Sequence, residues 1–312
     1  MKPDLVVAPR LLDSVMAALA RDFTIHRLFE AKDALAFVAP LQDKIRGFAS
    51  FTGYRVPAEL IAALPKLEII ATMSVGTDHI DLAAAKARGI AVTNAPDVLT
   101  DCVADIGMAL VLAVARRLIV ADRFVREGQW LKGTFPLATK VGGATMGVVG
   151  LGRIGKAVAK RAEAFGMNIV YHGRHRQSDV AYPFYDDLIA MARASDYLML
   201  AAPGGPSTRH LVNAAVLDAL GPEGVVINIA RGSVVDEKAR VAALQAGTLG
   251  GAGLDVYEDE PRVPEALMKL DNVVLLPHIA SATNATRNVM GQLMIDNLKA
   301  HFTGKPLLTR VG

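Results

Sequence analysis

Short apolar runs alternate with stretches of helical periodicity along nearly the whole chain, the pattern of a parallel β-sheet covered by helices. In the first third of the sequence the predicted strands are Leu5–Ala8, Thr24–Leu28, Gly47–Ser50, Ile69–Met73 and Ala91–Thr93. The predicted helices between them include Leu11–Arg21, Pro57–Leu64 and Leu82–Arg88. The pattern therefore predicts an α/β layer structure, and this part of the sequence contains no glycine-rich phosphate loop.

A second α/β series follows, with strands at the spacing of a complete dinucleotide-binding (Rossmann) sheet. Its predicted strands are Met146–Val149, Ile169–His172, Tyr197–Leu200, Val225–Ile229, Gly253–Val256 and Val273–Leu276. Between the two series, Thr100–Arg117 is predicted to form one long helix, and its apolar residues on nearly every side indicate burial.

The final helical stretch, Thr283–Leu298, follows the last strand of the second series and is expected to return to the first sheet. We therefore predict two α/β domains, each a parallel sheet covered by helices. The smaller is discontinuous, residues 1–97 and 283–312, and the larger is the Rossmann domain, residues 98–282. Hinges are expected near Pro96–Thr100 and Ser281–Arg287.

The composition narrows the class of protein. A chain of 312 residues, 52% of them apolar, is long enough for two domains with separate cores. Its net charge of +3 suits anionic small molecules and gives no sign of nucleic-acid binding. The single cysteine, Cys102, excludes an internal disulfide and a cysteine-based metal cluster. No signal peptide or membrane span is predicted, so we expect a cytosolic protein.

A glycine-rich segment, Gly150–Gly155, stands between the apolar run Met146–Val149 and a helix-like stretch. The first glycine permits a tight turn, the second lets backbone approach a pyrophosphate, and the third lets the helix pack closely on the strand. The N-terminus of the following helix favours phosphate. This context predicts that Gly150, Gly152 and Gly155 bind a dinucleotide, in preference to forming a merely structural turn.

The end of this unit, Tyr171–Arg176, indicates which dinucleotide binds. NAD-binding units usually place an acidic residue about 20 residues after the glycines, whereas a 2′-phosphate requires cations. No carboxylate lies between Ile169 and Gln177, and the basic stretch is Gly173, Arg174, His175 and Arg176. The sequence predicts preference for NADPH, with Arg174 as the leading phosphate ligand and Arg176 as the second. A solvated basic turn is the alternative.

Three polar side chains follow strands of the second series, at the sheet edge where α/β proteins bind ligands: Arg231, Glu260 and His278. A guanidinium can hold a carboxylate or carbonyl oxygen, and a protonated histidine can donate a proton to a developing alkoxide. A carboxylate beside the histidine favours the imidazolium form. Together they suit reduction of a 2-oxo acid by hydride. Taken one by one, the alternatives are a surface ion pair for Arg231, a solvated acidic run for Glu260 and a hydrogen-bonded loop histidine for His278.

The amino-acid sequence of these segments resembles that of the D-isomer-specific 2-hydroxyacid dehydrogenases. The resemblance rests, in this order, on Gly150–Gly155, Asn228–Glu237, Gly253–Pro261 and Leu276–Ser281. It extends from about Glu68 to the end of the chain. Around Asn94–Asp101 and at Arg174, the sequence is most similar to NADPH-dependent glyoxylate/hydroxypyruvate reductases and hydroxyphenylpyruvate reductases.

The resemblance implies roles for individual residues. His278 would be the proton donor, Glu260 its partner, and Arg231 the residue that binds and polarises the substrate. The smaller domain would bind the substrate carboxylate through backbone N–H groups of a loop that contains Ser74, Val75 and Gly76. The implied cofactor contacts are Arg153 and Ile154 at the pyrophosphate, and Ala230 and Asp255 near the nicotinamide.

The region around Trp130 packs against a second subunit in the family, which implies a homodimer in which Trp130 closes the partner's active site. A buried aromatic without catalytic contact is the alternative. The segment Phe51–Tyr54 matches no family pattern, so the size of the substrate pocket stays open. A small pocket would favour glyoxylate and hydroxypyruvate, and a large one would admit aromatic 2-oxo acids.

The sequence thus predicts a homodimeric, NADPH-preferring reductase of small 2-oxo acids, with NADH as a possible cofactor and no metal, nucleic-acid or membrane partner. One alternative is an NAD-dependent D-2-hydroxyacid dehydrogenase of another substrate. Another is a dinucleotide-sensing, corepressor-like binding protein on the same fold. An adenosyl-group enzyme with the same glycine turn would not explain Arg231, Glu260 and His278 together.

Overall fold

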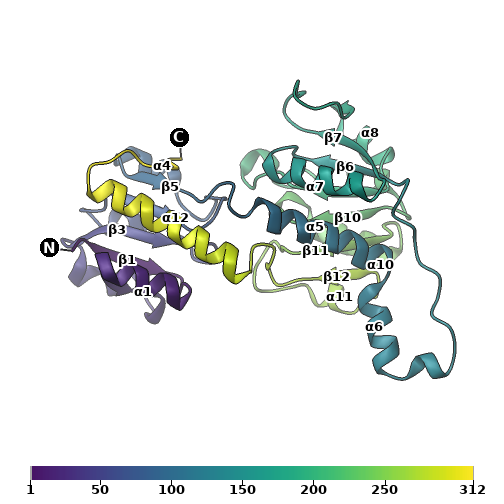
Figure 1. Ribbon diagram of the computed structural model, residues 1–312, viewed down its shortest axis with the longest axis horizontal. Helices are drawn as coiled ribbons and strands as arrows, with labels where there is room; N and C mark the ends of the chain where they lie inside the picture. The colour runs from purple at the N-terminus through teal and green to yellow at the C-terminus, as the bar shows by residue number, and fades with distance from the viewer. Residues whose placement is uncertain (1, 312) are drawn as a thin grey trace. The chain divides into compact units, whose positions relative to one another are not determined.

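The computed structural model describes residues 2–311, which form two compact units. One contains the residues up to Leu99 and those from Ala282 onward, and the other contains Thr100–Ser281. Each unit holds one sheet, with five strands in the first and seven in the second (Figure 1). All pairings between the named strands are parallel, so the predicted α/β fold with two parallel sheets covered by helices is confirmed.

The five-stranded sheet has the order β2-β1-β3-β4-β5. Its strands are β1 (Asp4–Ala8), β2 (Thr24–Arg27), β3 (Ile45–Ser50), β4 (Ile69–Thr72) and β5 (Ala91–Thr93). Its helices are α1 (Asp13–Asp22), α2 (Ala34–Val38), α3 (Ala58–Ala62), α4 (Leu82–Ala87) and α12 (Asn284–Phe302), with short 3-10 turns at η1 (Leu28–Glu30) and η2 (Ala39–Leu41).

The two faces of this sheet are covered by different helices because successive strand residues point to opposite sides. On one face, Phe48 and Ile70 join a core with Leu60 of α3 and Ala85 of α4. On the other, α12 packs against α1 and β4 (Figure 1). The last helix of the chain therefore completes the core of the N-terminal sheet.

The seven-stranded sheet has the order β12-β11-β10-β9-β6-β7-β8, a Rossmann order with one added edge strand. Its strands are β6 (Thr145–Val149), β7 (Asn168–His172), β8 (Phe184–Tyr185), β9 (Tyr197–Leu200), β10 (Val225–Asn228), β11 (Gly251–Leu254) and β12 (Val273–Leu275). Its longer helices are α5 (Thr100–Ala115), α6 (Leu118–Arg126), α7 (Arg153–Ala164), α8 (Leu188–Arg193), α9 (Ala214–Leu220), α10 (Glu237–Ala246) and α11 (Glu265–Met268). The 3-10 turns are η3 (Gln129–Leu131), η4 (Pro206–Thr208) and η5 (Gly232–Val234).

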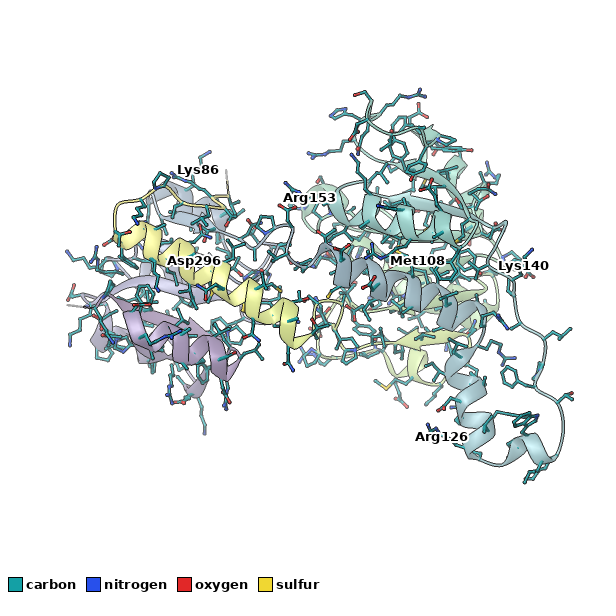
Figure 2. The ribbon with its side chains drawn as sticks, in the orientation of Figure 1. Lys86, Met108, Arg126, Lys140, Arg153 and Asp296 are labelled. Carbon is teal, nitrogen blue, oxygen red and sulfur yellow. The ribbon has the colours of Figure 1, made fainter. Side chains whose placement is uncertain are left out.

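Helix α5 is buried, as its all-round apolar sequence predicts. Met108 is on its buried side (Figure 2), and α5 packs against α7, β10 and β11. On the opposite face of the sheet, Leu198 and Val226 pack with Met191 of α8 and Leu217 of α9. No helix of the part of the chain that the structure describes has the length and apolar character required to cross a membrane.

The structure corrects some predicted boundaries. The strand expected at Gly253–Val256 is β11, Gly251–Leu254, which begins two residues earlier and ends before Asp255. The Asp255 carboxylate accepts hydrogen bonds from the chain after β12. Strand β8 has only two residues, too few for a recognisable alternation of side chains. The predictions also omit α6, which has no buried residue.

Candidate active site

The glycine turn after β6 has the conformation that a phosphate-binding loop requires. Gly150 has a φ of +91°, and a Cβ there would come within 2.7 Å of the backbone of Ala202. A side chain at Gly155 would collide with the carbonyl oxygen of Gly150. Helix α7 begins at Arg153, labelled in Figure 2, so its first amides point out of the turn. The turn therefore leaves backbone N–H groups to bind a dinucleotide pyrophosphate, and the residues present fit this group.

The loop that carries the two predicted phosphate ligands is fastened to the glycine turn. The Gln177 side chain donates a hydrogen bond to the carbonyl of Leu151 at 2.7 Å. Lys156 forms an ion pair of 2.6 Å with Asp179, and this contact lowers the pKa of the Asp179 carboxyl. These contacts hold the end of the βαβ unit next to its beginning, as a ligand bound at both would require.

Arg174 and Arg176 are exposed on this loop. The Arg176 guanidinium lies 5.9 Å from the ring centre of Phe184, and no described residue forms an ion pair with Arg174. An exposed guanidinium of this kind has N–H donors available for a phosphate group. Gly173 precedes Arg174 directly after β7.

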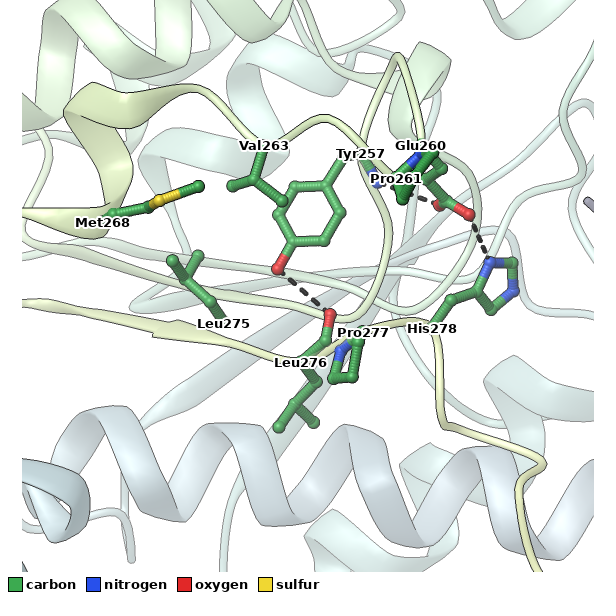
Figure 3. Close-up of a pocket in the computed structure, with 9 residues that line it drawn as sticks. All are labelled: Tyr257, Glu260, Pro261, Val263, Met268, Leu275, Leu276, Pro277 and His278. Carbon is green, nitrogen blue, oxygen red and sulfur yellow. Dashed lines mark hydrogen bonds and ion pairs between the residues drawn. The ribbon is translucent and has the colours of Figure 1, made fainter.

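His278 and Glu260 form a hydrogen-bonded pair. The Nδ1 atom of His278 lies 2.7 Å from Oε2 of Glu260, and the other carboxylate oxygen accepts the backbone N–H of Tyr257 at 3.1 Å (Figure 3). Burial raises the pKa of the Glu260 carboxyl, but the hydrogen bond and charge of His278, the Tyr257 amide and the charge of Arg231 outweigh this effect. The net pKa lies below the ordinary value for a glutamate, so Glu260 is ionised at neutral pH.

Asp255 anchors the segment that follows His278. It is completely buried, and its two carboxylate oxygens accept the backbone N–H groups of Ile279 and Ala280 at 2.7 and 2.9 Å. Burial raises the pKa of Asp255, although these two amides oppose the shift. His278 itself has a φ of +54°, a left-handed conformation that is unusual outside glycine. Asp255 thus maintains the turn that directs the imidazole towards Glu260.

Arg231 follows β10 and precedes the short turn η5. The buried Asn228 stabilises this turn, because its side chain donates to the carbonyl of Arg231 at 2.9 Å and accepts the N–H of Ala230 at 3.0 Å. The Arg231 guanidinium donates to the carbonyl of Ala230 at 2.7 Å, and its charge reaches Glu260. The structure therefore brings Arg231, Glu260 and His278 into one electrostatic group.

A cavity of about 310 Å³ adjoins this group (Figure 3). Most of its lining is apolar, and Glu260 and His278 form its polar end. The Tyr257 hydroxyl at its edge donates to the carbonyl of Leu276 at 3.0 Å, and burial raises the pKa of Tyr257 to about 12. The remaining lining residues are Pro261, Val263, Met268, Leu275 and Pro277.

The predicted substrate loop belongs to the other unit, at the carboxyl end of β4. The carbonyls of Ser74 and Val75 accept hydrogen bonds from the Ala95 amide and the Asn94 side chain, both at 2.8 Å. The backbone N–H groups of Val75 and Gly76 have no acceptor among the residues that the structure describes. Two adjacent unpaired amides suit an anionic oxygen.

Sequence reasoning missed the residues that support these side chains. Gln177 and Lys156 act through contacts with residues 26 and 23 positions away, and no local motif marks them. Asn228 lies in the segment Asn228–Glu237, but its bonds to Ala230 and Arg231 were not predicted. Residues 2–311 contain no cluster of three or more His, Cys, Asp or Glu side chains that could hold a metal ion.

Trp130 does not contribute to the core. It lies in η3 with 68% of its surface exposed, so the alternative of a buried aromatic is wrong. Leu131 and Leu137 are 94% and 99% exposed. These residues belong to the segment 118–140, which begins with α6 and projects from its sheet (Figure 1).

Comparison with known proteins identifies relatives over most of the chain. Residues 108–280 match the model of the D-isomer specific 2-hydroxyacid dehydrogenase family, NAD binding domain. A hydroxyphenylpyruvate reductase of Plectranthus scutellarioides is 50% identical over 293 residues, which are 94% of each chain. A glyoxylate/hydroxypyruvate reductase A of Arabidopsis thaliana is 49% identical over 293 residues, with the same coverage of both chains.

Among solved structures, the fold closely matches an NADPH-dependent glyoxylate/hydroxypyruvate reductase from Sinorhizobium meliloti, crystallised in complex with NADP and malonate. The TM-score is 0.95 at 46% sequence identity, and the match covers 100% of this chain and 97% of the other. The similarity therefore extends over both units and is not limited to the unit with the dinucleotide-binding sheet.

Proposed function

The chain belongs to the D-isomer-specific 2-hydroxyacid dehydrogenase family, and from this premise we propose that it reduces glyoxylate and hydroxypyruvate to 2-hydroxy acids with NADPH as preferred cofactor. It is an NAD(P)-dependent oxidoreductase of the glyoxylate/hydroxypyruvate reductase type. The observation that supports the proposed chemistry most directly is the 2.7 Å contact between His278 and the ionised Glu260. This pair can deliver a proton to a carbonyl oxygen as it becomes an alkoxide.

His278 is the proposed proton donor. With Nδ1–H donated to Glu260, a proton on Nε2 is present only in the imidazolium form, and the adjacent carboxylate stabilises its positive charge. The bound cofactor supplies the hydride that adds to the carbonyl carbon. The carbonyl π electrons move to oxygen, and this oxygen takes the Nε2 proton of His278, leaving neutral imidazole and a 2-hydroxy acid.

Arg231 is the proposed ligand of the substrate's 2-oxo group. Asn228 and η5 fix its backbone, and a guanidinium stabilises negative charge that develops on the carbonyl oxygen. We assign the substrate carboxylate to the N–H groups of the loop Ser74–Gly76, because the Val75 and Gly76 amides have no described acceptor. The structural unit that contains this loop is accordingly the proposed substrate domain.

The preference for NADPH rests on the loop after β7. Arg174 is exposed, forms no ion pair with a described residue, and lies on a loop anchored to the glycine turn by Gln177. The carboxylate nearest in sequence, Asp179, already pairs with Lys156. This distribution favours a 2′-phosphate over a ribose hydroxyl. Gly150–Gly155 would bind the pyrophosphate, and Ala230 and Asp255 would lie near the nicotinamide.

We further propose that the active protein is a homodimer in which the segment 118–140 covers a second copy. Its exposed apolar side chains support this proposal because a monomer would leave them in water. Trp130 would then reach the partner's active site.

A panel of 2-oxo acids tested with NADPH and with NADH examines the whole proposal. We expect the highest kcat/KM for glyoxylate or hydroxypyruvate with NADPH, and lower values for an aromatic 2-oxo acid. A preference for NADH would contradict the cofactor assignment. Failure to turn over any 2-oxo acid, despite dinucleotide binding, would favour the corepressor-like alternative.

A further inference from the structure

A buried hydrogen-bond network lies beneath the loop Ser74–Gly76. Ser50 ends β3 and Thr72 ends β4, and both side chains are buried. The Nε2 atom of His79 lies 3.2 Å from the Thr72 hydroxyl and 3.1 Å from the Ser50 hydroxyl. The Thr72 hydroxyl in turn lies 2.8 Å from that of Ser74. None of these side chains has a role in the proton transfer proposed above.

The donors in this network can be assigned by counting hydrogens. The Ser74 hydroxyl donates its single hydrogen to the Gly76 carbonyl at 2.7 Å, since a carbonyl only accepts. Thr72 must therefore donate its hydrogen to Ser74, and can only accept from His79. It follows that His79 carries its hydrogen on Nε2. The chain of donation runs from His79 through Thr72 and Ser74 to Gly76.

The chain of donation ends on the Gly76 carbonyl, which belongs to the peptide between Gly76 and Thr77 in the substrate loop. In a trans peptide the C=O and the following N–H point in opposite directions. The Ser74 hydroxyl holds the Gly76 carbonyl, while Ala95 and Asn94 hold the carbonyls of Ser74 and Val75. The orientations of the N–H groups of Val75, Gly76 and the next residue follow from these three carbonyl contacts.

We propose that His79 is a positioning residue for substrate recognition. Through Thr72 and Ser74 it fixes the peptide between Gly76 and Thr77, and so directs the Thr77 N–H, which has no described acceptor, beside the amides of Val75 and Gly76. This inference rests on the proposed function, since that function assigns the substrate carboxylate to this loop. Without an Nε2–H donor, the Thr72 hydroxyl is free to turn its hydrogen away from Ser74. The Ser74 hydroxyl then no longer receives the hydrogen bond from Thr72 that directs its own hydrogen towards the Gly76 carbonyl.

The test compares His79→Leu with His79→Gln, because glutamine places an amide N–H at a reach similar to Nε2 and leucine has no donor. We expect His79→Leu to raise KM for glyoxylate and Kd for malonate about tenfold, the effect of roughly one hydrogen bond. The kcat at saturation and the affinity for NADPH should stay within about twofold. His79→Gln should recover most of the binding, which a role in packing alone would not predict.

Thr72→Val removes the next link with little change in volume, and serves if His79→Leu does not fold. It should also raise KM about tenfold, whereas Ser50→Ala, which removes a hydroxyl outside the chain of donation, should stay near wild type. Unchanged malonate binding in both His79→Leu and Thr72→Val, or equal losses in His79→Leu and His79→Gln, would overturn the proposal.

Calorimetric titration with malonate measures binding without turnover, so it separates this proposal from the proposed function. If the wild type binds malonate but reduces no 2-oxo acid, the proposed function fails while the role of His79 is still tested. A wild type that does not bind malonate overturns the anion-binding assignment of the loop, and the role of His79 with it.

Discussion

The carboxylate of Glu260 accepts a hydrogen bond from Nδ1 of His278 at 2.7 Å, across a separation of 18 residues in the sequence. Both members of the pair are held by backbone contacts. The Tyr257 amide fixes the second oxygen of Glu260, and Asp255 fixes the two amides that follow His278. The orientation of the imidazole is therefore set before a substrate binds, which reduces the reorganisation that proton transfer requires.

Replacement of His278 by alanine should remove the proton donor. We expect kcat to fall by about two or more orders of magnitude, with the dissociation constant for NADPH nearly unchanged. Steady-state kinetics and fluorescence titration with NADPH measure the two quantities. His26→Gln is the matched control, since His26 pairs with Asp4 at the edge of the five-stranded sheet. An unchanged kcat in His278→Ala would remove this residue from the mechanism.

Glu260→Gln tests the charge of the pair while keeping a side chain of similar size. Because the native pKa of Glu260 is lowered, its ionised form stabilises the fold at pH values above the ordinary glutamate pKa of about 4.3. This stabilisation is lost as the pH falls through the native pKa. We expect urea unfolding to show wild type more stable than Glu260→Gln at pH 7, with the difference shrinking below about pH 4.3. A difference that grows towards acid pH would contradict the direction of the shift.

The sequence was sufficient to predict the fold class because strand runs and helical periods are local signals. Tyr197–Leu200 is found as predicted, and the βα spacing predicted the parallel Rossmann sheet. Helix α6 was missed although Leu118, Ile119 and Val125 give it an apolar side; that side is not buried in this chain, since each of the three side chains is about half exposed. A two-residue strand such as β8 gives too short a pattern to recognise.

For the candidate site, the residues that follow strand ends could be predicted and their supports could not. Arg231 and His278 lie three residues after the ends of β10 and β12, where parallel strands present ligands. Gln177 donates to Leu151 across 26 residues, and His79 reaches the ends of two separate strands, at Ser50 and Thr72. Such pairs depend on the final three-dimensional packing, and a single sequence carries no local trace of them.

Arg174→Ala should change cofactor selectivity. Loss of a charge-assisted contact to the 2′-phosphate is expected to lower kcat/KM for NADPH by about 10- to 100-fold. The value for NADH should change little, because NADH has no phosphate at this position. Lys160→Ala, which removes an exposed cation from the same domain, is the control and should leave the ratio of the two cofactors unaltered. Equal losses with both cofactors in Arg174→Ala would contradict the assignment.

A buried ion pair supports the loop between Tyr257 and Glu260. Arg240 is completely buried and donates to Glu237 at 3.0 Å, while its Nε and Nη1 atoms have no partner among the described residues. Glu237 also accepts the backbone N–H of Glu258 at 3.3 Å. Burial lowers the pKa of Arg240, and the charge of Glu237 opposes this effect. The buried positive charge of Arg240 is therefore balanced by the carboxylate of Glu237.

Glu237→Gln should leave Arg240 buried without its counter-charge and lower the free energy of unfolding by about 3 kcal/mol. The double variant Glu237→Gln/Arg240→Leu should recover much of this loss, because an apolar side chain removes the buried charge. Urea denaturation measures both. Glu265→Gln breaks an exposed pair with Lys269 and should cost at most about 1 kcal/mol. A cost for Glu237→Gln no larger than that of Glu265→Gln would show that the buried pair is dispensable.

The exposed segment 118–140 leads to a prediction about assembly. Trp130, Leu131 and Leu137 are 68%, 94% and 99% exposed, and contact of such apolar side chains with water is unfavourable. We expect sedimentation equilibrium to give twice the chain mass of 33.1 kDa, and Leu131→Glu to weaken association at least about tenfold. Leu308→Glu changes an exposed leucine of the other unit and should leave the dimer intact.

Trp130→Ala should leave a dimer with a raised KM for the 2-oxo acid, because the proposed place of Trp130 is at the partner's site. A wild type that stays monomeric at micromolar concentration, or a Leu131→Glu variant that associates normally, would contradict the proposed interface.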